Sequence, residues 1–336
     1  MVHSFPTPLL LPTSIGSTTL PLGFKMSKSK GNVVDPIEVG NKSGVEILRL
    51  WSVYEDYGQD LSCGQTELDR VTETYRKIRN TLRFMLGATS DFDSSHDMVP
   101  YEKMPELDQW ALGKLYELNK KITAAYEEYS FYKVYHALNT FFTVEISATY
   151  LDVLKDRLYT WKADGLERRS SQTVIYLMTD QLVRLMAPIL SFLSEEVYSY
   201  MKIDKKAESV FLLNFPIADE KWNNSNLMKK FDELVKIRGD VQKELEQLRT
   251  NKTIGSSLEA KVVITAEEPT FSILKSFQGL REYLIVSKVE LVQGAFAIQA
   301  KKADGEKCVR CWTYSESISK NEKTLGICPK CVEALS

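Results

Sequence analysis

Four of the five cysteines in this 336-residue chain lie near its end, in the pairs "CVRC" and "CPKC" separated by 16 residues. Each pair can place two thiolates on one ion, and two pairs complete the tetrahedron of sulfur ligands that suits Zn²⁺. Four protein ligands leave no position for water, so we expect one structural zinc rather than a catalytic one. The alternatives are an iron–sulfur cluster or cysteines without a shared role. The predicted ligands are Cys308, Cys311, Cys328 and Cys331.

A second group with chemical potential is "KMSKSKGNVVDP", residues 25–36, which combines lysines and serines with a Gly-Asn turn. Flexible lysines beside such a turn can neutralise charge that develops on a polyphosphate during phosphoryl or adenylyl transfer. A loop suits a group that must close and reopen. The chain has no G-x-x-x-x-G-K-[ST] motif, so this is no Walker loop. A chance Lys/Ser run or a solvated basic tail is the alternative.

Basic and aromatic residues surround the cysteines, among them Arg310 and Trp312. Cationic side chains neutralise phosphates, and an aromatic ring can stack on an unpaired base. The alternative is that the cations keep a small ribbon soluble while Trp312 covers its core. The formal net charge of -2 gives no bulk signal for nucleic-acid binding, which would need such a local basic face.

Composition excludes several classes of protein. Five cysteines, four of them clustered, argue against a disulfide framework, and we expect Cys63 to be an inert, partly buried thiol. No stretch is long and apolar enough to span a bilayer, so we expect no membrane association. The first 24 residues contain no Arg and four prolines, which disfavours an amphipathic transit peptide. We therefore expect an unstructured lead-in and a cytoplasmic protein.

Apolar periodicity predicts a mainly α fold with several domains. Residues 64–225 show helical spacing in successive segments and predict an α-helical bundle, with one helix from about 132 to 160. In this bundle we expect Pro188 to kink a helix and Ser194 to cap the next one. Residues 226–302 predict a linking helix and a small α+β module, and residues 303–336 a zinc finger. Residues 25–63 hold the lysine loop and a connecting segment.

The lysine loop resembles the signature loop of class I aminoacyl-tRNA synthetases, in the form used by the isoleucine and valine enzymes. Further segments, among them "EILRLWSVYEDYGQDL", "YRKIRNTLRFMLG" and "IGSSLEAKVVI", resemble the part of isoleucyl-tRNA synthetases that follows this loop. The closing "CVRCW…CPKC" resembles the C-terminal zinc finger of bacterial-type isoleucyl enzymes, whereas the valine enzymes typically end in a coiled coil. The resemblance extends from residue 25 to the end.

The resemblance implies roles for several residues. Lys28 would contact ATP with help from Lys25, and both would stabilise the transition state of isoleucyl-adenylate formation. Ser27 and Ser29 would share this ATP site, which takes Mg²⁺-ATP as a substrate of the full enzyme. The helical bundle would bind the anticodon stem-loop of tRNA(Ile), with the zinc finger helping to hold the tRNA. The candidate tRNA contacts are Arg157, Trp161, Arg168, Arg169, Arg310 and Trp312.

For the first four of these candidates the alternative is structural. The basic residues among them could be helix-end charges that pair with Asp152, Asp156 or Asp164.

The chain departs from the synthetase family in what it lacks. The family builds its active site on a Rossmann domain with a His-x-Gly-His motif and carries an editing domain, and neither is present here. We therefore expect the C-terminal part of such an enzyme, a monomer that meets ATP and isoleucine only through the missing domain. Isoleucine-dependent ATP–pyrophosphate exchange by the chain alone would contradict this expectation.

Four other functions remain open from the sequence. They are a stand-alone tRNA-binding module without catalysis, a valyl-type fragment, a DNA-repair glycosylase with the same finger spacing, and a helical scaffold. The glycosylase needs an N-terminal Pro-Glu, whereas this chain starts Met-Val-His.

Overall fold

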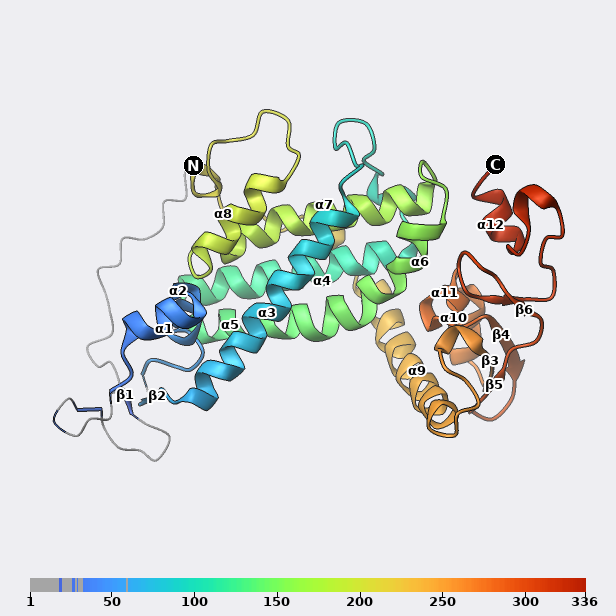
Figure 1. Ribbon diagram of the computed structural model, residues 1–336, viewed down its shortest axis with the longest axis horizontal. Helices are drawn as coiled ribbons and strands as arrows, with labels where there is room; N and C mark the ends of the chain where they lie inside the picture. The colour runs from blue at the N-terminus through green and yellow to red at the C-terminus, as the bar shows by residue number, and fades with distance from the viewer. Residues whose placement is uncertain (1–17, 20–25, 28, 30–32, 59) are drawn as a thin grey trace. The chain divides into compact units, whose positions relative to one another are not determined.

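The computed structural model describes residues 18–19, 26–27, 29, 33–58 and 60–336 (Figure 1). It divides into two compact units, which are described separately below. The first comprises residues 1–96, 114–148 and 175–220, and the second comprises residues 97–113, 149–174 and 221–336. The predicted ATP-contacting residues Lys25 and Lys28, and most of the predicted lead-in, lie outside the described residues.

The first unit is helical, as predicted. Its elements are β1 (Thr18–Thr19), α1 (Pro36–Ser43), α2 (Val45–Trp51), β2 (Leu61–Ser62), α3 (Gln65–Ala88), α5 (Phe131–Thr140), α8 (Ser191–Tyr200) and η4 (Val210–Leu212). Helices α4 (Glu106–Glu127) and α7 (Leu166–Met186) contribute residues to both units, as does the π-helical segment η3 (Phe141–Leu151). Helical backbone therefore continues from residue 131 to 160, where one helix was predicted.

Helix α3 shows how the sequence encodes this unit. Leu68, Val71, Ile78, Leu82 and Met85 recur at helical spacing, and each is no more than 6% exposed. At its start, the Glu67 carboxylate accepts the backbone N–H of Gly64 at 3.0 Å, which satisfies a donor that a helix end leaves without an intrahelical partner. The predicted apolar stripe is thus the buried face of α3.

The start of α8 differs from the prediction. The helix begins at Ser191, Ser194 lies buried inside it, and Pro188 lies in the turn after α7 instead of kinking a helix. The first-turn amides of Phe192 and Leu193 donate to Glu46 Oε1 of α2 at 2.9 and 3.1 Å. A carboxylate from a distant helix therefore caps α8, so no local serine cap is needed.

This cap gives a first prediction. Glu46→Ala should lower the free energy of unfolding by about 2 kcal/mol, because buried amide donors lose their acceptor. Urea denaturation followed by circular dichroism measures the change. Glu38→Ala is the control, since Glu38 is an exposed first-turn carboxylate of α1, and its effect should stay below about 0.5 kcal/mol. Equal losses in the two variants would contradict the role assigned to Glu46.

The second unit combines helices with small sheets. Its remaining elements are η2 (Tyr101–Lys103), α6 (Asp152–Thr160), α9 (Ser225–Thr250), η6 (Ser257–Glu259), β3 (Ala260–Ala266), α10 (Thr270–Ser276), α11 (Leu280–Leu284), β4 (Lys288–Gln293), β5 (Ala297–Lys302), β6 (Glu306–Lys307), β7 (Tyr314–Ser315), η7 (Glu322–Thr324) and α12 (Pro329–Glu333), with η5 (Glu220–Trp222) at its boundary. Strands β4, β3 and β5 form one sheet in that order, as the predicted α+β module requires, and β6 pairs with β7.

The core of this module follows the alternation of β3. Ala260, Val262, Ile264 and Ala266 are fully buried, while the residues between them lie on the other face of the sheet. The helix α9 lies beside β5 (Figure 1). Aromatic side chains continue this core, since the Trp110 ring stacks on Phe231 with centroids 5.1 Å apart. None of the helices in the described part of the chain has the length and apolarity that crossing a bilayer requires.

Candidate metal centre and RNA-binding surface

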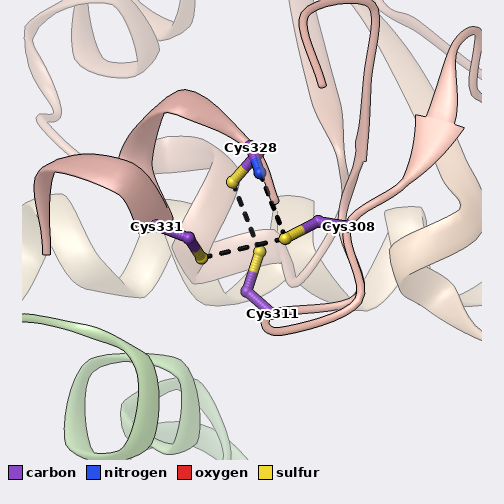
Figure 2. A group of neighbouring side chains, drawn as sticks. All are labelled: Cys308, Cys311, Cys328 and Cys331. Atoms are coloured by element: carbon purple, nitrogen blue, oxygen red, sulfur yellow. Dashed lines mark hydrogen bonds between the residues drawn. The ribbon is translucent and has the colours of Figure 1, made fainter. Parts of the chain in front are cut away.

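The four predicted zinc ligands lie together in the second unit. Cys308 and Cys311 form a turn between β6 and β7, while Cys328 caps the short helix α12 and Cys331 lies within it. Figure 2 shows the four side chains pointing toward a common centre. The structure therefore brings together two pairs that 16 residues separate in the chain.

The sulfur geometry suits a single zinc ion. All four Sγ atoms lie within 4.8 Å of one another, with 3.8 Å between Cys308 and Cys331 and 3.6 Å between Cys311 and Cys328. A tetrahedron with Zn–S bonds of about 2.3 Å requires sulfurs about 3.8 Å apart. The cysteines are 6% exposed or less and form no disulfide. The residues present fit structural zinc, and four sulfur ligands fill its coordination.

The surroundings of these thiols lower the pKa of one of them, Cys308. Burial opposes ionisation of Cys308, but backbone N–H groups of Cys311, Cys328 and Arg310 outweigh it and lower its pKa to about 6. The amide of Cys328, for example, donates to Cys308 Sγ at 3.3 Å. Burial raises the pKa of Cys311 and Cys331. Zinc binding must therefore displace protons from these two thiols.

Arg157, a predicted tRNA contact, is instead buried inside the second unit. Its side chain is 6% exposed, and Nη1 lies 3.4 Å from each carboxylate oxygen of Asp108, which is fully buried. Tyr150 and Ser170 donate hydroxyl hydrogen bonds to the same carboxylate at 2.7 and 2.6 Å. Burial raises the pKa of Asp108, against the influence of Arg157 and these hydroxyls. Arg157 therefore forms an internal ion pair, and its predicted contact with RNA would require that pair to break.

Trp161 and Arg310 lie together at the end of α6. The indole N–H of Trp161 donates to Asp156 Oδ2 at 3.0 Å, and the guanidinium of Arg310 donates to the backbone carbonyl of Thr160. The ammonium of Lys330 lies 5.7 Å from the Trp161 ring centroid and contacts Asp156. Lys330 is one of the basic residues around the cysteines but was not among the six candidate tRNA contacts, and it precedes the second cysteine of its pair just as Arg310 does.

The remaining basic candidates support the turn between α6 and α7. Arg168 donates to the carbonyls of Leu158 and Ala163 at 3.1 and 2.9 Å. Arg169 lies 3.3 Å from a carboxylate oxygen of Asp97. Both guanidinium groups also donate to Gln172 Oε1, at 3.4 Å from Arg168 and 2.8 Å from Arg169. Both side chains are half-buried, so each keeps some accessible surface.

Trp312 differs from the other candidates because it is 61% exposed. Its backbone adopts a left-handed φ of 67°, and the ammonium of Lys307 lies 5.6 Å from its ring centroid. An exposed indole beside a cation suits stacking on an unpaired base with a phosphate nearby. In the lysine loop, Ser27 and Ser29 are described, and their hydroxyl oxygens lie 2.8 Å apart.

Three family models match segments of this chain. The model described as "Anticodon-binding domain of tRNA ligase" matches residues 108–264. "Zinc finger found in FPG and IleRS" matches residues 305–334, which contain all four cysteines. "tRNA synthetases class I (I, L, M and V)" matches residues 16–64, which contain the lysine loop. The finger model also covers FPG, but the other two matches name tRNA ligases.

Curated relatives extend the match over most of the chain. The isoleucine–tRNA ligase of Geobacter sulfurreducens is 47% identical over 327 residues, which cover 93% of this chain and 35% of the relative. That of Thermotoga maritima is 44% identical over 323 residues, with 93% and 35% covered. Among solved structures, the LeuRS–tRNA–LeuAMS ternary complex of Agrobacterium radiobacter K84 matches with a TM-score of 0.48 and 15% identity, covering 83% of this chain and 32% of that one.

The family models and the curated relatives agree with the lysine loop, the helical region and the buried four-cysteine cluster in their order along the chain. The four-cysteine finger is also the feature that favours the isoleucine enzymes over the valine enzymes. The chain belongs to the isoleucine–tRNA ligase family and spans about 35% of the length of the curated relatives that it matches.

Proposed function

We propose that this chain supplies the tRNA-binding part of an isoleucine–tRNA ligase, which charges tRNA(Ile) with isoleucine at the expense of ATP. The observation that carries the proposal is the zinc finger, a buried four-cysteine site with the exposed Trp312 and Lys307 on its surface. In this proposal the four cysteines hold one structural zinc. The domain boundaries, the monomeric state and the cytoplasmic location stay predictions of the sequence.

The ATP-handling role belongs to the lysine loop in this proposal. Lys28 and Lys25 neutralise charge on the phosphates of Mg²⁺-ATP, and Ser27 and Ser29 line the same loop. This chemistry requires the nucleotide- and isoleucine-binding domain of the whole enzyme. The match of residues 16–64 to class I tRNA synthetases supports the assignment.

The proposed RNA surface centres on Trp312. Arg310, Trp161, Arg168 and Arg169 are half-buried and use part of their polar atoms within the second unit, so we assign them supporting contacts. Arg157 is left out, because reaching RNA would require breaking its buried pair with Asp108.

Replacing Trp312 tests the proposal. Trp312→Ala should raise the Kd for a tRNA(Ile) transcript about tenfold, because base–aromatic stacking contributes about 1–3 kcal/mol. Melting temperature should change little, since the ring is 61% exposed. Filter binding at fixed salt, with tRNA(Val) in parallel, gives the affinities.

The matched control is Leu325→Ala, which removes an exposed side chain from the same finger. Leu325 cannot stack on a base, so this variant should bind tRNA(Ile) like the wild type. If the wild-type chain binds neither tRNA, or if both variants bind as tightly as it does, the proposed surface is wrong.

A further inference from the structure

Each half of the zinc site carries a cation directly before its second cysteine. Arg310 precedes Cys311, and Lys330 precedes Cys331. Both side chains reach from the finger to the end of α6, within the same compact unit. Two equivalent positions in the finger thus contact a single helix end.

Lys330 makes an ionic contact with Asp156 of α6. Its ammonium lies 2.8 and 2.6 Å from the two carboxylate oxygens of Asp156, and the two side chains are only 21% and 27% exposed. The same carboxylate accepts the Thr160 hydroxyl at 2.6 Å and the Trp161 indole N–H at 3.0 Å. A partly buried, multiply bonded pair of this kind fixes geometry more firmly than an exposed one.

Arg310 contacts the backbone at the same place. It donates to the carbonyl of Thr160, the last residue of α6, after which Trp161 is extended with φ of -87° and ψ of 169°. The last carbonyls of a helix lack intrahelical partners and carry its partial negative charge. A guanidinium there satisfies one of them and is electrostatically favoured.

We propose that Lys330 and Arg310 are positioning residues that fix the zinc finger on the end of α6. Because each cation lies between two cysteines, zinc binding orders its backbone and thereby directs its side chain toward α6. Zinc would then determine the position of the exposed Trp312 as well as the folding of the finger. An effect of this position on RNA binding rests on the proposed function, whereas the contact between the finger and α6 does not.

The competing role for Lys330 is a direct contact with an RNA phosphate. Such a contact would have to break the pair with Asp156, so the two roles predict opposite effects of Asp156→Asn. If Lys330 positions the finger, losing the carboxylate weakens RNA binding. If Lys330 contacts phosphate, losing the carboxylate frees the ammonium and strengthens binding.

The first experiment measures docking without RNA. In the zinc-loaded full chain, Lys330→Gln and Asp156→Asn should each accelerate amide hydrogen exchange of residues 157–165 about tenfold. Zinc content should stay at one per chain, and Lys330→Arg should restore protection. The control is Lys323→Gln, an exposed lysine of the same finger, which should change nothing. Zinc-stripped wild type should show the same acceleration. Unchanged exchange in both variants would overturn the proposal.

The second experiment measures tRNA(Ile) affinity against salt. Lys330→Gln and Asp156→Asn should both raise Kd about tenfold without changing the slope of log Kd against log[salt]. Direct phosphate contact predicts tighter binding by Asp156→Asn and a slope reduced by about 0.7–0.9 in Lys330→Gln, and either result overturns the positioning role. If no form binds RNA, the proposed function fails, and the exchange experiment still decides the docking.

Discussion

Removing zinc is expected to unfold the finger and leave the helices of the first unit folded. The buried apolar core of the finger consists of the four cysteines and Ile327, with the partly buried Ile318 and Val332 packed against it. So small an apolar core cannot offset the entropy of ordering the segment, whereas structural zinc contributes about 10–16 kcal/mol in comparable fingers. Hydrogen exchange after chelation should show protection lost in residues 306–333 and retained in α3.

Cysteine substitutions separate the ligands from a bystander. Cys331→Ser should abolish stoichiometric zinc and expose the finger to proteolysis. Cys63→Ala is the matched control, because Cys63 is also buried but lies outside the cluster, and it should retain one zinc per chain. A Cys331→Ser protein that keeps full zinc and full protection would contradict the four-ligand site.

Breaking the buried pair of Asp108 and Arg157 should produce the second large effect. Asp108→Asn preserves size but leaves the guanidinium, whose side chain is 6% exposed, without a counter-charge. Removing one partner of a buried ion pair costs about 3–5 kcal/mol, because the remaining charge stays desolvated. The loss should appear in urea denaturation of the zinc-loaded chain, followed by circular dichroism.

Two further variants test this explanation. Lys155→Met removes a cation from the same helix, but Lys155 is 61% exposed and pairs with Asp152 at 2.8 Å, so the cost should stay below about 0.5 kcal/mol. Adding Arg157→Met to Asp108→Asn should recover part of the lost stability, since no charge then remains buried. A double variant as unstable as the sum of the single ones would show that the two residues act independently.

The sequence alone was sufficient to predict the four-cysteine cluster and the helices, which depend on the spacing of nearby residues. The C-x-x-C pairs predicted one four-cysteine cluster, and apolar periodicity predicted the helices, because ligand geometry and helical pitch act over a few residues. One signal was overlooked, since Asp35 followed by Pro36 marks the start of α1, where Asp35 accepts the amide of Ile37 at 2.7 Å.

Tertiary structure alone decided the surroundings of each candidate contact. Arg157 and Trp312 were both predicted to contact RNA, yet Arg157 lies in an internal ion pair and Trp312 is exposed. The partners explain the difference. Asp108 is 49 residues from Arg157 along the chain, and Asp156 is 174 residues from Lys330. The role of a charged side chain depends on the groups that desolvate and neutralise it. Folding brings those groups together from segments that are distant in the sequence, so sequence spacing does not predict them.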